Sequence, residues 1–253
     1  MTGFHAFLGK EFREIVKTWR IWVLPGIVLF FAVTGPVIAR LTPQLVQALA
    51  PDTGLVLQIP DPTSLDAYLQ WTKNLVQIVT FAIIIIFAGA VSAERRSGTA
   101  VLVLTKPLRR TAFIVAKGLA QGAFLVGTAA VGAAVTWALT SAVFGEAPVG
   151  PLAGATAVWM VWGLMVLGIM VFLSSLVGSQ AGAAGLGLGA FVLFSIASIW
   201  GPAVRYSPAG LLGAPSDILV GRAGPLLWPV VTAFALTAVC LAQAVWAFSR
   251  KEL

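Results

Sequence analysis

Long apolar runs alternate with short polar segments along this chain. Six runs are long enough to cross a bilayer, whose hydrocarbon core takes about 20 helical residues: 21–39, 75–93, 113–144, 152–177, 183–200 and 226–248. Residues 147–204 carry no charge and are too long for one span, so we expect a break at Gly178–Gly182. The pattern predicts an all-α integral membrane protein with a single six-span domain over residues 21–253.

An N-terminal segment, residues 1–20, shows a different periodicity. Apolar residues recur there at steps of three and four, and charged residues fall opposite them. This pattern predicts an amphipathic helix lying in the membrane interface; a cytosolic helix packed on a partner is the alternative. A secretory signal peptide fits poorly, because the charged segment is long and no convincing cleavage site follows. The apolar positions are Phe4, Phe7, Leu8, Phe12, Ile15 and Trp19, opposite Lys10, Arg13, Glu14, Lys17 and Arg20.

Composition agrees with a membrane protein. Of the 253 residues 59% are hydrophobic and 10% charged, with a mean hydropathy of +0.96, whereas soluble domains carry about 25% charged residues. A net charge of +7 would suggest nucleic acid in a soluble protein. Here the cytoplasmic bias of basic residues and anionic membrane lipids explain it, and no nucleic-acid partner is expected. One cysteine, Cys240, excludes an intrachain disulfide.

The distribution of basic residues sets the expected orientation. The segment 94–117 between the second and third spans carries six of them, and basic loops stay in the cytoplasm. With both termini cytoplasmic, only Arg40, Lys73, Arg205 and Arg222 lie outside. Lys117, near the start of the third span, is expected to extend its ammonium group toward the interface.

The outer segment before the second span has its own signals. Thr63 or Ser64 is expected to cap a short helix with Asp66 in its first turn. Tyr68 and Trp71 are expected at the level of the lipid headgroups.

The basic loop also has features of a docking surface. Ser97-Gly98-Thr99 predicts a turn, and a small apolar patch, Val101 to Leu104, lies between basic residues. An apolar patch next to water is typical of a surface that a partner covers. Glu94, at the root of the loop, is expected either to form an ion pair with a basic residue of the loop or a partner, or to be a solvated helix-end carboxylate.

Motifs for chemistry within the chain are missing. The sequence has no G-x-x-x-x-G-K-[ST] pattern, no HExxH and no CxxC, and no charged residue at the middle of a predicted span, where ion-coupled carriers usually place one. A transport path lined by spans without such charges suits an amphipathic or lipid-like cargo. Its polar candidates are Gln77, Gln121, Thr128, Thr136, Ser174, Ser175 and Gln243.

Glycine pairs four residues apart are a further feature of the spans. They suit close helix packing, either within the chain or between subunits. The pairs are Gly118/Gly122, Gly178/Gly182 and Gly185/Gly189.

The loop resembles a known family. Glu94, Gly98-Thr99, Leu104, Pro107 and Arg110 match E-x-x-x-G-T-x-x-x-x-L-x-x-P-x-x-R, the signature of ABC-2 type permeases, the membrane subunits of a class of ABC transporters. The resemblance implies a six-span subunit of the bacterial cytoplasmic membrane that pairs with a second copy or a homologue. It also implies a separate ATPase that binds ATP and Mg²⁺ and docks on the 94–117 loop, so that this chain binds no cofactor and is not itself an enzyme. The coupling residues would be Glu94, Gly98, Thr99, Val101, Leu102, Leu104, Pro107 and Arg110.

Other functions remain open at this stage. A membrane scaffold or assembly factor that binds partners and transports nothing would have the same spans. A secondary carrier is disfavoured by the lack of charge within the spans, and a membrane enzyme by the lack of an acid–base or metal constellation.

Overall fold

The computed structural model describes residues 2–49, 61–96 and 110–250, and every regular element in these ranges is helical. The first half contains α1 (Thr2–Lys17), α2 (Arg20–Leu49), α3 (Ser64–Asn74), the π-helical turn η1 (Leu75–Val79), α4 (Thr80–Phe87), α5 (Ser92–Arg96) and α7 (Arg110–Phe144). The second half contains α8 (Val149–Leu176), α9 (Gln180–Ala197), α10 (Gly201–Tyr206), the 3₁₀ turn η2 (Pro208–Leu211), α11 (Ala214–Leu219) and α12 (Leu227–Arg250).

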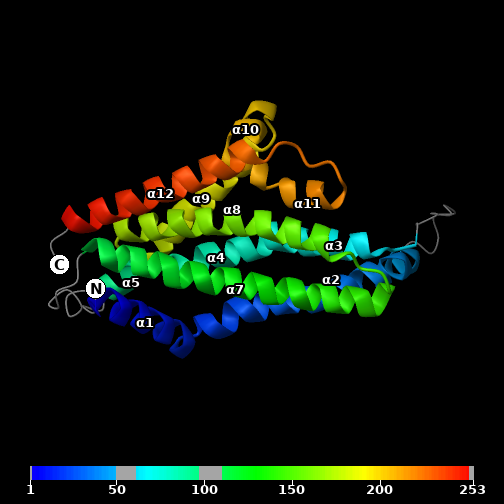
Figure 1. Cartoon of the computed structure of the whole chain (residues 1–253), viewed down its shortest axis with the longest axis horizontal. Coiled ribbons are helices and arrows are strands. Elements are labelled where there is room, and N and C mark those ends of the chain that lie inside the picture. The colour runs from blue at the N-terminus through cyan, green and yellow to red at the C-terminus, as the bar shows by residue number, and fades with distance from the viewer. Residues whose placement is uncertain (1, 50–60, 97–109, 251–253) are drawn as a thin grey trace.

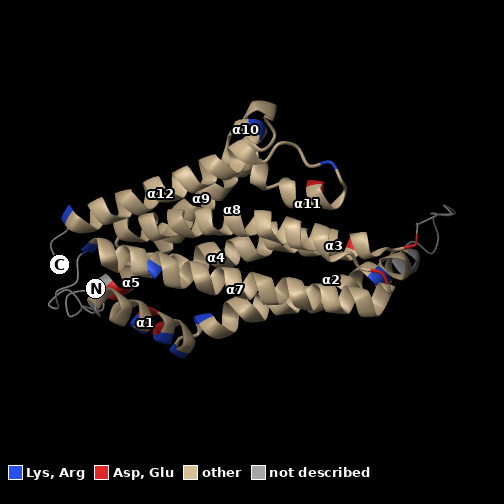
Figure 2. Cartoon of the chain, in the orientation of Figure 1, with Lys and Arg blue, Asp and Glu red and all other residues tan. Residues whose placement is uncertain are grey.

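The long helices run side by side in one elongated bundle, and both chain termini lie at the same end of it (Figure 1). Charged residues gather toward the two ends of the bundle (Figure 2). Within the described residues six helical segments are long and apolar enough to cross a membrane: Arg20–Val46, Ser64–Glu94, Arg110–Phe144, Val149–Leu176, Gln180–Ala197 and Leu227–Arg250. The predicted fold class, six spans after an N-terminal helix, is confirmed.

The first span is longer than its apolar run, because α2 continues from residue 39 to Leu49. Pro25, Pro36 and Pro43 all lie inside this helix. This extension is attached to α7, because the guanidinium of Arg40 donates a hydrogen bond of 2.8 Å to the carbonyl of Val143 near the end of α7. A helix needs apolar residues only where it crosses the membrane, so hydropathy does not mark its end.

The second span begins at Ser64, before the apolar run that predicted it. The Asp66 carboxylate accepts hydrogen bonds from both the backbone N–H and the hydroxyl of Thr63, at 2.8 and 2.9 Å, and so fixes the first turn of α3. The expectation for Tyr68 and Trp71 is wrong: both are buried. They lie in the core because α3 packs against α2, α7 and α11, and the indole N–H of Trp71 donates to the hydroxyl of Thr156 on α8 at 3.1 Å.

Helix α8 lies at the centre and packs against α7, α12, α4, α9 and α11. Its side chains Trp159, Trp162 and Met165 are fully buried. The indole of Trp162 donates to the hydroxyl of Thr80 at 3.2 Å, and that hydroxyl in turn bonds the carbonyl of Leu75. The π-helical turn in the second span is thus stabilised by a side chain of α8.

One glycine permits a close crossing of three helices. A Cβ added to Gly132 on α7 would lie 2.5 Å from a methyl group of Val28 on α2 and 2.6 Å from the ring of Trp71 on α3. The predicted glycine pairs differ from one another. Gly118 and Gly122 face Leu241 and Leu164 of the same chain, whereas open space surrounds Gly185 and Gly189.

Candidate functional site

The root of the basic loop is a bend in the second span. Between α4 and α5 the helix is interrupted, and the hydroxyl of Ser174, near the end of α8, accepts hydrogen bonds from the backbone N–H groups of Val91 and Ser92, both at 3.0 Å. The same hydroxyl donates to that of Ser92. These bonds satisfy the first N–H groups of α5 and set the direction in which α5 presents Glu94.

Glu94 belongs to a group of five charged side chains from three elements, which we call the charge cluster. Its members are Lys10, Glu11 and Glu14 from α1, Glu94 from α5 and Lys117 from α7. Glu94 Oε1 accepts from Lys117 Nζ at 2.7 Å and from Lys10 Nζ at 2.8 Å. The ion-pair expectation for Glu94 is confirmed, with one partner from the loop segment and another from α1.

Lys117 is the most buried member of the charge cluster. Its relative exposure is 0%, and its Nζ contacts both oxygens of Glu11, at 3.1 and 3.0 Å, besides Glu94. An ammonium group has three hydrogens to donate, and each here has a carboxylate acceptor. The expectation that Lys117 extends to the interface is wrong, because its partners lie inside the protein.

Helix α1 brings three of the five charges together by its periodicity. Lys10 and Glu14 are four residues apart and pair at 2.6 Å, while Glu11 lies on the buried stripe between Phe7 and Ile15. Glu11 was not among the site residues predicted from the sequence. Its spacing was the available signal, because Glu11 lies one helical turn after Phe7 and one turn before Ile15. A carboxylate is stable at such a buried position only when it is paired.

An aromatic stack flanks the charges. The ring of Phe7 on α1 stacks on Phe113 of α7 at 5.2 Å, and Phe113 stacks on Phe248 of α12 at 5.0 Å. Lys10 Nζ lies 5.3 Å from the Phe7 ring, and Lys117 Nζ 5.2 Å from that of Phe113. Apolar rings on one side and carboxylates on the other hold each ammonium group in one position.

The last residue of the family signature ties α7 to α12. Arg110, the first residue of α7, donates from Nη1 to the carbonyls of Phe248 and Ser249, at 3.0 and 2.7 Å. Carbonyls at the end of a helix lack partners within the helix and carry partial negative charge, so a guanidinium suits them. The two ends of the loop are thus attached to α1 and α12.

The electrostatics of the charge cluster favour its paired state. Burial by itself lowers the pKa of Lys10, but hydrogen bonds to the carboxylates of Glu14 and Glu94 outweigh it and raise that pKa well above its ordinary value of 10.5. Oxygens of Glu11, Glu14 and Glu94 lie within 4.8 Å of one another, close enough to surround a cation. The ammonium groups of Lys10 and Lys117 bind these carboxylates, so two lysines supply the positive charge at this place.

Several predicted residues lie elsewhere. Gly98, Thr99, Val101, Leu102, Leu104 and Pro107 fall outside the described residues. The predicted apolar face of the N-terminal helix is divided: Phe7 and Ile15 are buried in the protein, Phe4 and Leu8 pack against its core, and Phe12 is exposed. Trp19 is exposed too, but α1 ends at Lys17 and Trp19 lies in the turn before α2. The position of α1 in the membrane interface stays a prediction.

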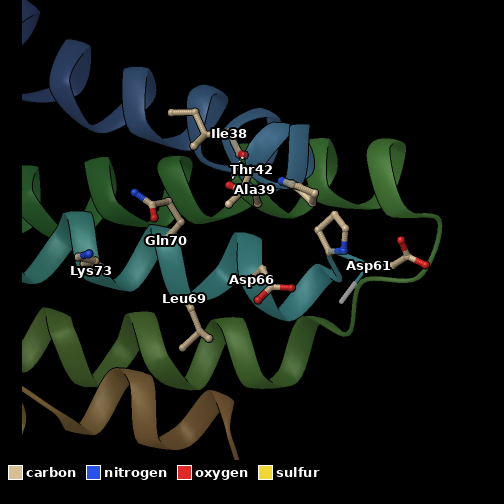
Figure 3. A pocket seen from close by; sticks show the side chains of 10 residues that line it. Ile38, Ala39, Thr42, Asp61, Asp66, Leu69, Gln70 and Lys73 are labelled. Carbon is tan, nitrogen blue, oxygen red and sulfur yellow. Dashed lines mark hydrogen bonds between the residues drawn. The ribbon is translucent and has the colours of Figure 1, made fainter. Parts of the chain in front are cut away.

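A pocket of about 400 Å³ lies at the opposite end of the bundle, between α2 and α3 (Figure 3). Its polar lining includes Asp61, Asp66, Gln70 and Lys73. Asp66 already accepts the two hydrogen bonds from Thr63 that cap α3. We therefore assign the polar groups here to helix capping and solvation, and the charge cluster is the candidate site.

The chain resembles known proteins over most of its length. The chain is similar to an uncharacterized transmembrane protein, YxlG, of Bacillus subtilis (strain 168), with 23% identity over 256 residues that cover 98% of this chain and 97% of that protein. Residues 6–210 match the model of the family described as ABC-2 family transporter protein. This match includes most of α1, both ends of the basic loop and every member of the charge cluster, and the chain accordingly belongs to the ABC-2 transporter family, whose members are membrane components of ABC transporters rather than their ATP-binding parts.

Proposed function

We propose that this chain is the permease subunit of an ATP-driven exporter or flippase for an amphipathic or lipid-like substrate. A separate ATPase subunit, which binds ATP and Mg²⁺, docks on the 94–117 loop and supplies the energy. The permease acts with a second copy of itself or a homologue in a bacterial cytoplasmic membrane, with both termini cytoplasmic. In this proposal the partner, and not this chain, binds the nucleotide and the metal.

The observation that carries the proposal is the fully buried Lys117, which joins Glu11 of α1 and Glu94 of α5. A pull or push on the loop by the ATPase moves α5, and Glu94 moves with it. The charge cluster cannot separate cheaply, because an uncompensated buried charge costs several kcal/mol. Hence α1 and α7 follow α5 as one unit, and Arg110 passes the same motion to α12.

The nature of the cargo is inferred from the spans. The described part of the membrane helices carries polar side chains such as Gln121 and Thr128 but few charges between its ends. A small hydrophilic ion would need compensating charge along its path. An amphipathic molecule can keep its apolar part in the lipid while its head follows the protein.

The test is reconstitution of the permease with candidate ABC ATPase subunits from the same genome. Leu104→Asp places a charge in the apolar patch and should abolish co-purification, since burying one Leu is worth about 1.5–3 kcal/mol, a tenfold or larger change in affinity. Leu104→Met keeps an apolar side chain and should bind normally. Glu94→Gln should bind the ATPase but lose most of the permease's effect on ATP hydrolysis, because it weakens the joint and leaves the docking patch intact.

Translocation distinguishes a transporter from a scaffold. In proteoliposomes, ATP should accelerate the movement of a fluorescent phosphatidylethanolamine between leaflets, measured by dithionite quenching. A complex that assembles normally but shows neither lipid movement nor a change in ATP hydrolysis would instead indicate a scaffold or assembly factor. If Leu104→Asp binds and couples like the parent, the loop is not the docking site.

A further inference from the structure

The segment between α9 and α12 folds into a compact hairpin at the end of α12 far from the chain termini (Figure 1). Ser207 ends α10 and caps η2, accepting a hydrogen bond from the backbone N–H of Ala209. Gly210 lies so close to the carbonyl of Val204 that any side chain at this position would collide with it. Helix α11 then packs against α8 and α3, so the hairpin is a fixed part of the fold.

This hairpin and the start of α12 enclose a cavity of about 550 Å³. Apolar side chains, among them Ile199, Val204 and Leu226, form much of its wall. Its two charged lining residues have opposite signs: Arg205 comes from α10 and Asp217 from α11. The cavity therefore has an apolar surface, one cation and one anion.

The two charges are available to a ligand. Among the residues that the structure describes, neither Arg205 nor Asp217 has an ion pair within 4.0 Å, and no hydrogen bond to either side chain is formed. The guanidinium carbon of Arg205 lies 5.3 Å from the centre of the Tyr206 ring. Opposite charges that line one cavity without pairing can each bind a complementary group.

Aromatic residues around the hairpin place the cavity at the membrane interface. Trp200, Tyr206 and Trp228 are all more than half exposed, and the rings of Tyr206 and Trp228 meet edge to face at 6.5 Å. Exposed Trp and Tyr near the ends of membrane helices are typical of the headgroup level, where their apolar and polar parts are both accommodated.

We propose that this cavity binds the headgroup of a zwitterionic phospholipid from the outer leaflet. The phosphate binds the Arg205 guanidinium in a charge-assisted contact, the amine binds the Asp217 carboxylate, and the acyl chains leave along the apolar wall. An anionic lipid would bring its charge next to Asp217 without an amine to offset it, and a cationic amphiphile would meet Arg205 in the same way. Only a headgroup with both signs satisfies both residues. The choice of the outer leaflet rests on the orientation proposed above, with both termini cytoplasmic, whereas the binding itself does not depend on transport.

The test is native mass spectrometry of the purified full chain in detergent, titrated with defined lipids. Dioleoyl-phosphatidylethanolamine should be retained at least fivefold more strongly than dioleoyl-phosphatidylglycerol. Its N-acetylated form, which keeps the phosphate but loses the amine charge, should bind as weakly as phosphatidylglycerol. This comparison uses the unchanged protein and so does not depend on the folding of any variant.

Substitutions of the two charged lining residues test whether the lipid binds in this cavity. Arg205→Gln and Asp217→Asn should each weaken retention of phosphatidylethanolamine at least fivefold without lowering the unfolding temperature. Arg222→Gln is the matched control, an exposed arginine of the same outer segment that does not line the cavity. Equal binding of all three lipids, or loss in Arg205→Gln but not in Asp217→Asn, overturns the proposal. The latter result would mean that the cavity selects an anion alone.

Discussion

Lys117 stabilises the protein because its removal would leave two buried carboxylates without a positive partner. Its ammonium group lies between Glu11 and Glu94, and neither carboxylate is exposed enough for water to replace it. Replacing a whole buried ion cluster by apolar side chains is often neutral, but removing one member leaves a charge uncompensated. The charge cluster is thus sensitive to single substitutions and much less so to paired ones.

We predict that Lys117→Met lowers the free energy of unfolding by about 3–5 kcal/mol, because two carboxylates lose their buried partner. Adding Glu11→Gln to Lys117→Met should restore part of this loss. Denaturant unfolding of the two single variants and the double variant measures the coupling. Lys17→Met, at an exposed position of α1, is the control and should unfold like the parent. Strictly additive losses would show that Lys117 and Glu11 do not interact.

The raised pKa of Lys10 gives a pH prediction with a definite sign. A cation whose pKa is higher in the folded state stabilises the fold at pH values below its ordinary pKa, 10.5. That stabilisation is lost only as the pH rises through the higher, folded value. The difference in unfolding temperature between the parent and Lys10→Met should therefore stay constant from pH 7 to about 10 and shrink at higher pH. A difference that disappears between pH 7 and 9 would contradict the assignment.

At the scale of helices, α1 has two different faces. Phe7 and Ile15 are buried against the bundle, while Phe12 and Val16 are exposed. A helix attached on one side and apolar on the other can stay in the membrane interface and still move with α7. The periodicity of α1 predicted an amphipathic helix, but not that its apolar residues divide between the protein and its surroundings.

The spans could be predicted from the sequence, whereas the partners of the buried charges could not. The length of an apolar run is a local property, so the existence of six spans followed from hydropathy. The environment of Lys117 is not local, because its partner Glu11 lies 106 positions away in the chain. Seen in sequence alone, a lysine near the end of a span suggests contact with water. The break between α4 and α5 and the π-helical turn that begins at Leu75 could not be predicted for the same reason, since each depends on a side chain from α8.

Close packing of helices gives the third prediction. Gly132→Ala should destabilise the protein by about 1–3 kcal/mol, because the new methyl group overlaps Val28 and Trp71 where α7 crosses α2 and α3. Gly127→Ala on the same helix meets open space and should be neutral or stabilising, since alanine is the better helix former. Thermal unfolding of the two variants side by side measures the difference. Equal behaviour would mean that the crossing is looser than described.

On the scale of the whole molecule, the positions of the charges bear on its orientation. α1, the charge cluster and the end of α12 lie at one end of the bundle, and α3 and the α7–α8 turn at the other (Figures 1 and 2). The described residues at the two ends of the basic loop also lie there, since Glu94 belongs to the charge cluster and Arg110 bonds the end of α12. Because positively charged segments are retained in the cytoplasm, an ATPase would meet the charge cluster from that side, and the lipid cavity would face outward.

This orientation gives the last prediction, made in a Cys240→Ala background so that each variant has a single cysteine. Gly150→Cys and Ala223→Cys, exposed positions at the start of α8 and before α12, should react in intact cells with a maleimide that cannot cross the membrane. Gly9→Cys, exposed on α1 with open space around it, should react only after the cells are permeabilised. Denatured samples, in which all three cysteines are accessible, control for expression. Labelling of Gly9→Cys in intact cells together with silence at the other two positions would reverse the orientation, and would place the basic loop where no cytoplasmic ATPase could reach it.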